Sequence, residues 1–241
     1  MSEVLREMCK RKNWFKRFIV SLLLGLSLVC LAPKTIFAGI EPYKLKESSI
    51  TRVVEQQQVK GKILIYHTHT KEEYVDSNVV EMGNDLKTKL EKKGYIVDHV
   101  EDNFSVDYNN AYNSSRKYLQ SVNLGEYDLI IDYHRNSPTL NNTVKVKDVD
   151  VARGMFVLDK WSPNFEEGER ATNGIVTQMD KFNGNIMRYN FYYEGGINGF
   201  NTDLSKNIVL LEAGDVNNDK LEVMRLNTYM ASAIDSYLEN N

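Results

Sequence analysis

The sequence predicts an α/β domain with a doubly wound, mostly parallel sheet flanked by helices. Short apolar runs bounded by turn residues alternate along the chain with longer segments of helical period. This alternation is typical of successive β-α-β units. In addition, chemically active side chains follow three of the apolar runs, and in open α/β sheets ligands bind beyond the carboxyl ends of strands. We expect one such domain over residues 61–241.

Five short apolar runs are the expected strands. They are too short for buried helices and lack a polar alternation, as strands covered on both faces should. The runs span residues 62–66, 95–100, 127–133, 154–158 and 207–211. A polar connection over residues 137–149 separates the third run from the fourth.

The expected helices lie between and after these strands. Apolar residues at helical spacing predict helices over residues 79–90, 109–122, 166–187 and 223–237. Gly94 follows the first of them, as a glycine commonly follows a helix end. The last helix carries a continuous apolar stripe, which we expect to pack on the sheet.

The first 39 residues differ from the rest of the chain. Six Lys and Arg residues precede an apolar run over residues 18–33, an order typical of a secretion signal or a membrane anchor. The run has about 16 residues, which is short for a membrane-spanning helix. Ala38 and Gly39 form an acceptable cleavage site. A cleaved signal peptide or a retained anchor would each place the remainder outside the cytoplasmic membrane, joined by a polar tether over residues 40–60.

Composition excludes some partners and sites. The first 39 residues have a net charge of +5 and the whole chain −3, so the remainder carries −8. An acidic surface argues against a nucleic-acid partner, which requires a basic face. Both cysteines, Cys9 and Cys30, precede the domain. The domain therefore has neither a disulfide framework nor a cysteine metal site.

Three expected strands end in groups that could hold and use a metal ion. The first is followed by two histidines and two glutamates, the third ends in an Asp-Tyr-His-Arg sequence, and the last ends in a glutamate. The residues are His67, His69, Glu72, Glu73, Asp132, His134, Arg135 and Glu212. In a parallel sheet these three ends share one edge, where two histidines and a carboxylate suit a zinc ion with an open position. A further carboxylate could accept a proton from zinc-bound water.

The same residues allow a plainer interpretation. The histidines after the first strand could be exposed in a turn, and His134 could be a hydrogen-bonded residue at a strand end. A buried carboxylate costs free energy unless it has a partner. Glu212 could therefore be paired with Arg135 for structural reasons. His99, at the end of another strand without a partner motif, is expected at the surface.

Four segments in order carry a resemblance to a known family. They contain Ile-Tyr-His-Thr-His-Thr-x-Glu-x-Tyr (Ile65–Tyr74), Tyr-x-x-Ser-Arg (Tyr112–Arg116), Asp-Tyr-His-Arg (Asp132–Arg135), and Asn-Thr-Asp-Leu-Ser (Asn201–Ser205) followed by Leu-Glu-Ala-Gly (Leu211–Gly214). Together they resemble the stage II sporulation protein P family over residues 62–240.

The resemblance implies a zinc-dependent peptidoglycan hydrolase, similar in fold to the N-acetylmuramoyl-L-alanine amidases. Such an enzyme cleaves the amide between the lactyl group of N-acetylmuramic acid and L-alanine, and family members are also described as endopeptidases acting on peptide cross-links. The family acts in engulfment during sporulation. The implied cofactor is Zn²⁺, and the implied partners are peptidoglycan, stage II sporulation proteins D and M, and the membrane through the N-terminal segment.

The resemblance also implies roles for individual residues. His69, Glu72 and His134 are the expected zinc ligands, and Glu212 is the expected catalytic residue. Alternative ligands are His67, Glu73 and Glu81. Arg116 and Arg135 are expected to bind substrate, although a structural ion pair competes as an interpretation of Arg116. Asp132 and Asp203 are expected to support the site from behind.

Departures from the family pattern keep other functions open. Asn136 replaces an aspartate, Lys71 replaces a serine, and the longer region between anchor and catalytic domain is nearly absent. One alternative is a wall-binding or scaffold homologue that has lost catalysis. A weaker one is a zinc carboxypeptidase of unrelated origin.

Overall fold

The expected alternation of strands and helices is present in the computed structural model, which describes residues 59–102, 104 and 107–241. These residues belong to one compact unit, Glu55–Asn241. The expected signal or anchor over residues 1–39, and the tether except for its last two residues, lie outside the described part. None of the helices described has both the length and the apolar character of a membrane span.

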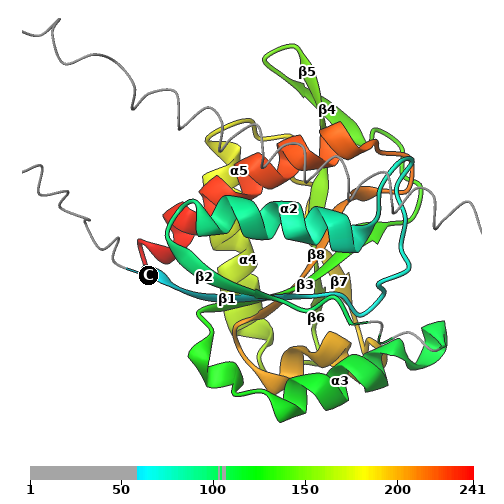
Figure 1. Ribbon diagram of the computed structural model, residues 1–241, viewed down its shortest axis with the longest axis vertical. Coiled ribbons are helices and arrows are strands. Elements are labelled where there is room, and N and C mark those ends of the chain that lie inside the picture. Colours follow the sequence, from blue (N-terminus) through cyan, green and yellow to red (C-terminus); the bar gives the residue numbers. More distant parts are fainter. Residues whose placement is uncertain (1–58, 103, 105–106) are drawn as a thin grey trace, which may run out of the picture. The chain divides into compact units, whose positions relative to one another are not determined.

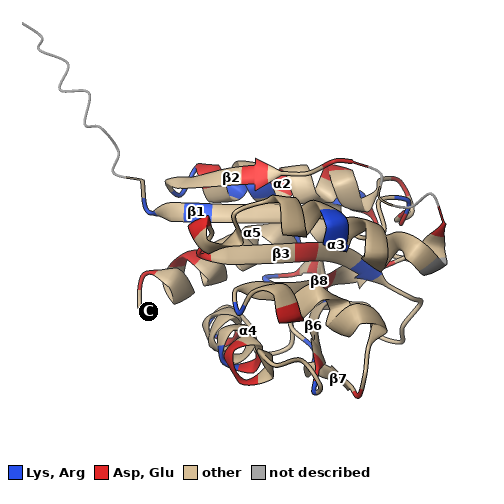
Figure 2. Cartoon of the chain, turned by 90° about the horizontal axis from the view of Figure 1, so that it is seen from below, with Lys and Arg blue, Asp and Glu red and all other residues tan. Residues whose placement is uncertain are grey.

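The described strands form one main sheet and a separate hairpin. The main sheet contains β1 (Gly61–Tyr66), β2 (Tyr95–His99), β3 (Leu129–Asn136), β6 (Gly154–Asp159), β7 (Phe191–Tyr193) and β8 (Ile208–Asp215). Figure 2 shows their order from top to bottom, β2-β1-β3-β8-β6-β7. The first four run parallel, whereas β6 is antiparallel to β8 and β7 is parallel to β6. The sheet is mixed and mostly parallel.

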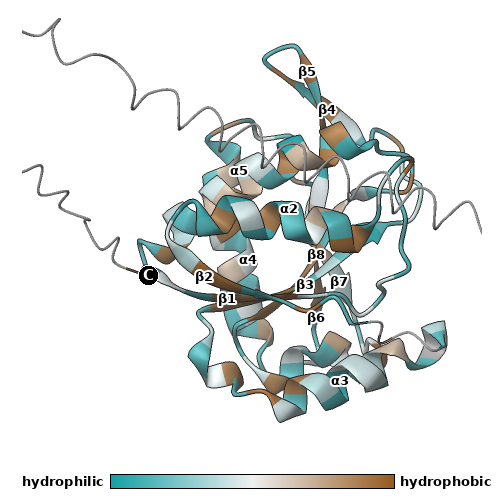
Figure 3. Cartoon of the chain, viewed as in Figure 1, coloured by the Kyte–Doolittle hydropathy of each residue, from teal (hydrophilic) through white to brown (hydrophobic). Residues whose placement is uncertain are grey.

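Helices cover both faces of this sheet (Figure 1). The helices α2 (Val79–Glu91), α4 (Phe165–Asp180) and α5 (Lys220–Leu238) pack on one face, against residues such as Ile63 and Ile131. On the other face, α3 (Ala111–Ser121) packs on neighbours of these residues such as Leu64 and Ile130. Because successive strand residues enter opposite cores, the strands are apolar throughout, as Figure 3 shows along the centre of the domain.

The structure differs from the sequence prediction in three places. The polar connection contains a hairpin, β4 (Thr143–Val146) and β5 (Val149–Ala152), which projects from the helices in Figure 1. Its turn residues Lys147 and Asp148 have positive φ values of 48° and 67°, a conformation that asparagine and glycine signal better. Helix α4 ends at Asp180 rather than continuing to residue 187. Strand β7 and the irregular turn η4 (Ile197–Leu204) were not predicted.

A buried histidine pair joins the ends of β1 and β2. His67 Nδ1 lies 2.8 Å from the carbonyl oxygen of Tyr133, and a carbonyl only accepts, so the ring proton is on Nδ1. His67 Nε2 then accepts from His99 Nε2 at 2.8 Å. The His99 side chain is only 2% exposed, so the prediction of a surface histidine is wrong. Burial lowers the pKa of His67 to about 3, which keeps its ring neutral near pH 7.

Helix α2 approaches this pair so closely that residue 83 must be glycine. A Cβ on Gly83 would lie 2.6 Å from His67 Cε1 and 3.0 Å from His99 Nε2. We predict that Gly83→Ala lowers the free energy of unfolding by about 1–3 kcal/mol, because the hydrogen-bonded rings cannot move aside. The loss should appear in urea unfolding although alanine favours a helix by about 1 kcal/mol.

The matched control is Gly168→Ala in α4, whose Cβ would meet Leu158 Cδ2 at an acceptable 3.4 Å. We expect this control to be neutral or slightly stabilising. Equal effects of the two substitutions would contradict the steric explanation.

Candidate metal centre and catalytic site

The parallel ends of β1, β3 and β8 bring the predicted groups to one edge of the sheet. Tyr66 is in register with Asp132, and His134 is in register with Glu212. After β1 the chain turns back, and the amide of Glu72 donates to the carbonyl of His69 at 3.1 Å. The turn directs these two side chains over the end of β3. The sequence prediction that the three strand ends meet is confirmed.

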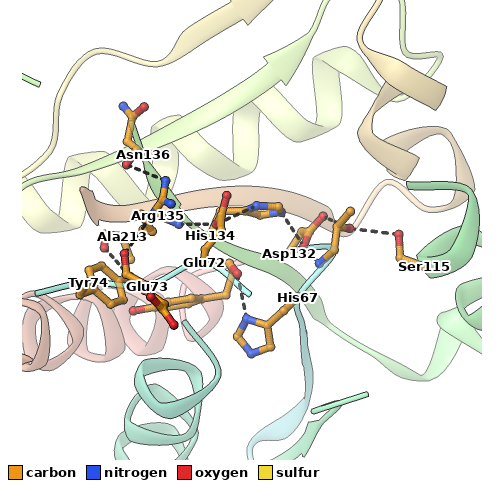
Figure 4. A network of polar contacts seen from close by, with 12 residues as sticks. His67, Glu72, Glu73, Tyr74, Ser115, Asp132, His134, Arg135, Asn136 and Ala213 are labelled. Atoms are coloured by element: carbon orange, nitrogen blue, oxygen red, sulfur yellow. Dashed lines mark hydrogen bonds and ion pairs between the residues drawn. The ribbon is translucent and has the colours of Figure 1, made fainter. Parts of the chain in front are cut away.

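His134 lies between two carboxylates and is almost fully buried (Figure 4). Its Nε2 is 2.9 Å from Asp132 Oδ1, and its Nδ1 is 3.4 Å from Glu72 Oε2. Burial alone would lower the pKa of His134, but the two carboxylates raise it well above its ordinary value. Without a metal, the ring is therefore held as a cation. The position demands positive charge, which a metal ion at Nδ1 would also supply.

His69 faces the same space. Its ring centroid is 5.3 Å from that of His134, at an interplanar angle of 77°. Its other face is covered by Tyr108, stacked at 4.0 Å. Burial lowers the pKa of His69, so the ring is neutral. Its Nδ1 is buried with no hydrogen-bond partner within the described residues, and such an orphan is a natural metal ligand.

Glu72 is a buried anion. Burial would raise its pKa, but His134 and the backbone amide of Arg135 lower it overall. That amide donates to Glu72 Oε2 at 3.1 Å. Because the amide of Arg135 holds one of its oxygens, the ionised carboxylate of Glu72 can interact with the neighbouring histidine or with a cation.

Glu212 also has an unsatisfied side-chain atom. Its Oε2 is buried and has no hydrogen-bond partner among the residues described. Burial raises the pKa of Glu212 to about 7. The charge of Arg135 lowers this pKa but does not outweigh burial, and its guanidinium donates to the carbonyls of Glu73 and Asn136. A carboxyl group that titrates near neutrality is suited to general acid–base catalysis.

The residues fit a zinc ion, although the described part of the chain contains no preassembled cluster of three His, Cys, Asp or Glu ligands. Two tetrahedral histidine ligands with zinc–nitrogen distances of about 2.0–2.1 Å have ring centroids about 5 Å apart. The rings of His69 and His134 already have this spacing. With Glu72 they form a two-histidine, one-carboxylate set, which leaves a position open for catalysis. Asp132 supports His134 from behind, a common arrangement at zinc sites.

The four groups line a cavity of about 650 Å³, together with Arg135. Other predicted residues lie elsewhere. Arg116 does not line the cavity but forms a two-pronged ion pair with Asp203, so the structural interpretation fits it better than substrate binding.

The alternative ligands also lie away from the cavity lining. The Glu73 side chain is exposed, and Glu81 pairs with Lys220 at the surface. His67 is committed to His99, as described above. None of the three is positioned as the predicted alternative ligand.

Aromatic rings of the cavity were missed by sequence reasoning. Phe191 and Tyr193 on β7 contact each other, with centroids 5.0 Å apart, and Tyr193 contacts Phe200 at 5.0 Å. Phe200 contacts Tyr112, which lies against both His69 and His134. The rings thus continue from the proposed ligands to the edge strand. The one available signal was the run of aromatics at 191–193.

Comparison with known proteins identifies the family that the motifs resemble. The family model described as "Stage II sporulation protein P (SpoIIP)" matches residues 37–235. The chain belongs to this family. The stage II sporulation protein P of Bacillus subtilis strain 168 is 28% identical in an alignment of 204 positions that covers 69% of this chain and 48% of that protein. The chain thus spans about half the length of this curated relative.

Solved amidase structures are also similar to the chain. The CwlD amidase of Clostridioides difficile, in complex with the GerS lipoprotein, has a TM-score of 0.49 and 13% identity, covering 75% of this chain and 100% of that one. The N-acetylmuramyl-L-alanine amidase Ami1 of Mycobacterium abscessus has a TM-score of 0.49 and 10% identity, covering 75% and 97%. Similarity at this level carries no conclusion about activity.

The raised pKa of Glu212 predicts a pH-dependence of stability. In the unfolded chain this carboxyl has its ordinary pKa of 4.5, whereas in the folded protein it is about 7. Between these values the folded state binds more protons, so stability falls as the pH rises. We predict that metal-free Glu212→Gln loses less stability than the wild type between about pH 5 and about pH 8. Urea unfolding across this range measures the difference.

Glu73→Gln, at an exposed carboxylate that does not line the cavity, is the control and should follow the wild-type curve. Parallel curves for the wild type and Glu212→Gln would contradict the assignment.

Proposed function

We propose that this chain is a zinc-dependent peptidoglycan hydrolase that cleaves the amide between N-acetylmuramic acid and L-alanine. The observation that carries the proposal is the unpaired Glu212 carboxyl beside His69, Glu72 and His134 in one cavity. Membership of the stage II sporulation protein P family supports a role in the sporulating cell. Peptide cross-links are the second bond that we propose within the same substrate.

In this proposal His69, Glu72 and His134 hold the zinc ion. When bound, zinc supplies Lewis-acid catalysis and lowers the pKa of water from 15.7 to about 7. Glu212 is the general base: its carboxylate takes a proton from the attacking water, whose oxygen adds to the amide carbon. As the carbon–nitrogen bond breaks, Glu212 returns the proton to the leaving nitrogen. The products are a carboxylic acid and the free amine of the peptide.

The cavity lining suits both parts of this substrate. Phe191 and Tyr193 are 49% and 46% exposed, unlike aromatic residues of a core. Such rings can pack on the apolar faces of a sugar while the sugar hydroxyls stay in water. Arg135 and Arg188 line the same cavity, and guanidinium groups bind carboxylates such as those of acidic stem peptides. We assign saccharide contact to the aromatic residues and peptide contact to the arginines.

The cellular setting is part of the proposal. The basic and then apolar leader, which lies outside the described residues, would place the domain on the outer side of the cytoplasmic membrane. Stage II sporulation proteins D and M are the proposed partners during engulfment, by resemblance to the family. No contact surface for either protein is assigned.

We predict that Glu212→Gln retains one zinc ion per chain but releases no stem peptides from purified sacculi. His69→Ala and His134→Ala should lose both zinc and activity, because each removes a ligand. Metal analysis and mass spectrometry of the products, with and without chelator, measure the two properties and identify the bond that is cleaved.

Glu81→Gln is the matched control, since it changes only a surface ion pair with Lys220, and it should retain zinc and activity. Normal turnover by Glu212→Gln would refute the assignment of the base. Stoichiometric zinc in the wild type without release of any peptide would favour the wall-binding alternative.

We also predict that Tyr193→Ala raises KM for a soluble muropeptide about five- to tenfold and changes kcat little, because a contact of about 1 kcal/mol with the saccharide is lost. Steady-state kinetics on one substrate measures the effect. Tyr189→Ala is the control, since Tyr189 is 98% exposed and does not line the cavity. The saccharide assignment fails if both variants change KM equally.

A further inference from the structure

A line of buried hydrogen bonds leads from Asp132, behind His134, to the turn η4. Thr68 Oγ1 donates to Asp132 Oδ2 at 2.7 Å and lies 3.0 Å from Ser115 Oγ on α3. Asn201 Nδ2 donates to the same Ser115 oxygen at 3.0 Å. Thr68, Ser115 and Asn201 have no exposed surface. The line thus connects a side chain that contacts a proposed zinc ligand with a loop on another part of the cavity.

The direction of each hydrogen bond is fixed by chemistry. The ionised Asp132 can only accept, so the single hydroxyl proton of Thr68 is used on it. The hydroxyl of Ser115 is then the donor in its 3.0 Å contact with Thr68, with the carbonyl of Tyr112 at 3.3 Å as its other acceptor, and its oxygen accepts from Asn201. The amide oxygen of Asn201 accepts in turn from Arg116 Nη1 at 3.4 Å. The donors within this line point toward Asp132, while Ser115 and Asn201 also contact the carbonyl of Tyr112, and a connected buried network of this kind holds its side chains in place.

The far end of the line is a strained turn. Residues 198–201 have φ values of 51°, 56°, 53° and 59°, the left-handed region, although only Gly199 is a glycine. Asn201 within this turn is held by Ser115, and Asp203 is held by Arg116 at 2.8 and 2.5 Å. Strained turns persist where surrounding contacts determine them, often at functional sites. Here the turn carries Phe200 and Ile197 into the cavity lining.

We propose that Ser115 and Asn201 are positioning residues that couple the orientation of His134 to the conformation of the turn at residues 197–204. Asp132 fixes the ring of His134, and the hydrogen-bond line fixes Asp132 relative to the turn. The proposal rests on the proposed zinc site. It follows that zinc at His134 stabilises the turn, and that breaking the line weakens zinc binding although neither residue touches the metal position.

The test uses Ser115→Ala, which removes the central hydroxyl. We expect zinc affinity, measured by competition with a chromogenic chelator, to fall 10- to 100-fold, as for other residues that support a zinc-bound histidine. We also expect zinc to increase the hydrogen-exchange protection of residues 197–204 in the wild type and much less in Ser115→Ala. Neither readout depends on catalysis.

Two sets of controls separate positioning from general destabilisation. Ser121→Ala removes an exposed hydroxyl of the same helix, one that donates to the carbonyl of Tyr118, and should change neither readout. Thr68→Ser keeps the hydroxyl and should keep wild-type affinity, whereas Thr68→Val fills the same space without it and should resemble Ser115→Ala. If Ser115→Ala does not fold, the Thr68 pair decides alone.

The outcomes are distinguishable from those of the proposed function. Unchanged zinc affinity in both Ser115→Ala and Thr68→Val, with zinc bound normally by the wild type, overturns only the coupling. The coupling is also overturned if Ser115→Ala weakens zinc affinity but zinc protects residues 197–204 from hydrogen exchange as much as in the wild type. A wild-type protein that binds no zinc overturns the proposed zinc site and the coupling together.

Discussion

The buried carboxylate of Asp132 is the constraint on which the site depends. An unpaired charge without exposed surface would cost several kcal/mol, and Asp132 has no exposed surface. Thr68 meets this demand with its backbone amide and its hydroxyl, and His134 lies 2.9 Å away. Burial alone would raise the pKa of Asp132, but these partners lower it. Since Thr68 follows β1 and His134 lies on β3, the charge is tolerated only if the two strands keep their parallel register. The fold and the geometry of His134 are therefore determined by the same contacts.

The groups in front of His134 are satisfied much less well than those behind it. Glu212 and His69 each have a buried polar atom without a hydrogen-bond partner in the described chain, and burial raises the pKa of Glu212. Native proteins retain few such groups, and each one lowers stability unless a ligand completes it. The end of this strand therefore has two functions. The hydrogen-bonded groups behind His134 stabilise the fold, and the unpaired polar atoms in front of it are available to a cation and a substrate. A divalent ion would satisfy His69 and replace the proton that His134 otherwise carries between two carboxylates.

The sequence was sufficient for the strands and for the edge where they end, because strands buried on both faces are continuous apolar runs with polar residues directly after them. It was insufficient where the same type of residue could make either of two different sets of contacts. His67 and His69 are two residues apart and would share one side of a strand, but β1 ends at Tyr66 and the turn separates them, so that His67 reaches His99 in the core. Likewise, a guanidinium binds a protein carboxylate and a substrate carboxylate with the same geometry, and only the fold reveals that Arg116 meets Asp203. The run of left-handed residues in η4 contains Asn198, Gly199 and Asn201, which favour this conformation, but the sequence does not show that Phe200 adopts it too, because tertiary contacts impose it.

Asn136, where an aspartate is usual in the family, was one reason to consider an inactive homologue, together with the short region after the leader, and its position weakens that reason. Its carbonyl accepts from Val216 and Arg135, while its side-chain amide points away from His134 and Glu72 in Figure 4. The residues that the proposed chemistry requires are present without a carboxylate here: Asp132 supplies the charge behind His134, Glu72 the charge beside it, and Glu212 the base. Because Asn136 lines the cavity, the exchange removes a negative charge from the lining rather than from the proposed ligand set. For the proposed substrate, the missing charge should affect which charged stem peptides approach the cavity, since like charges repel each other, more than it affects the proposed cleavage.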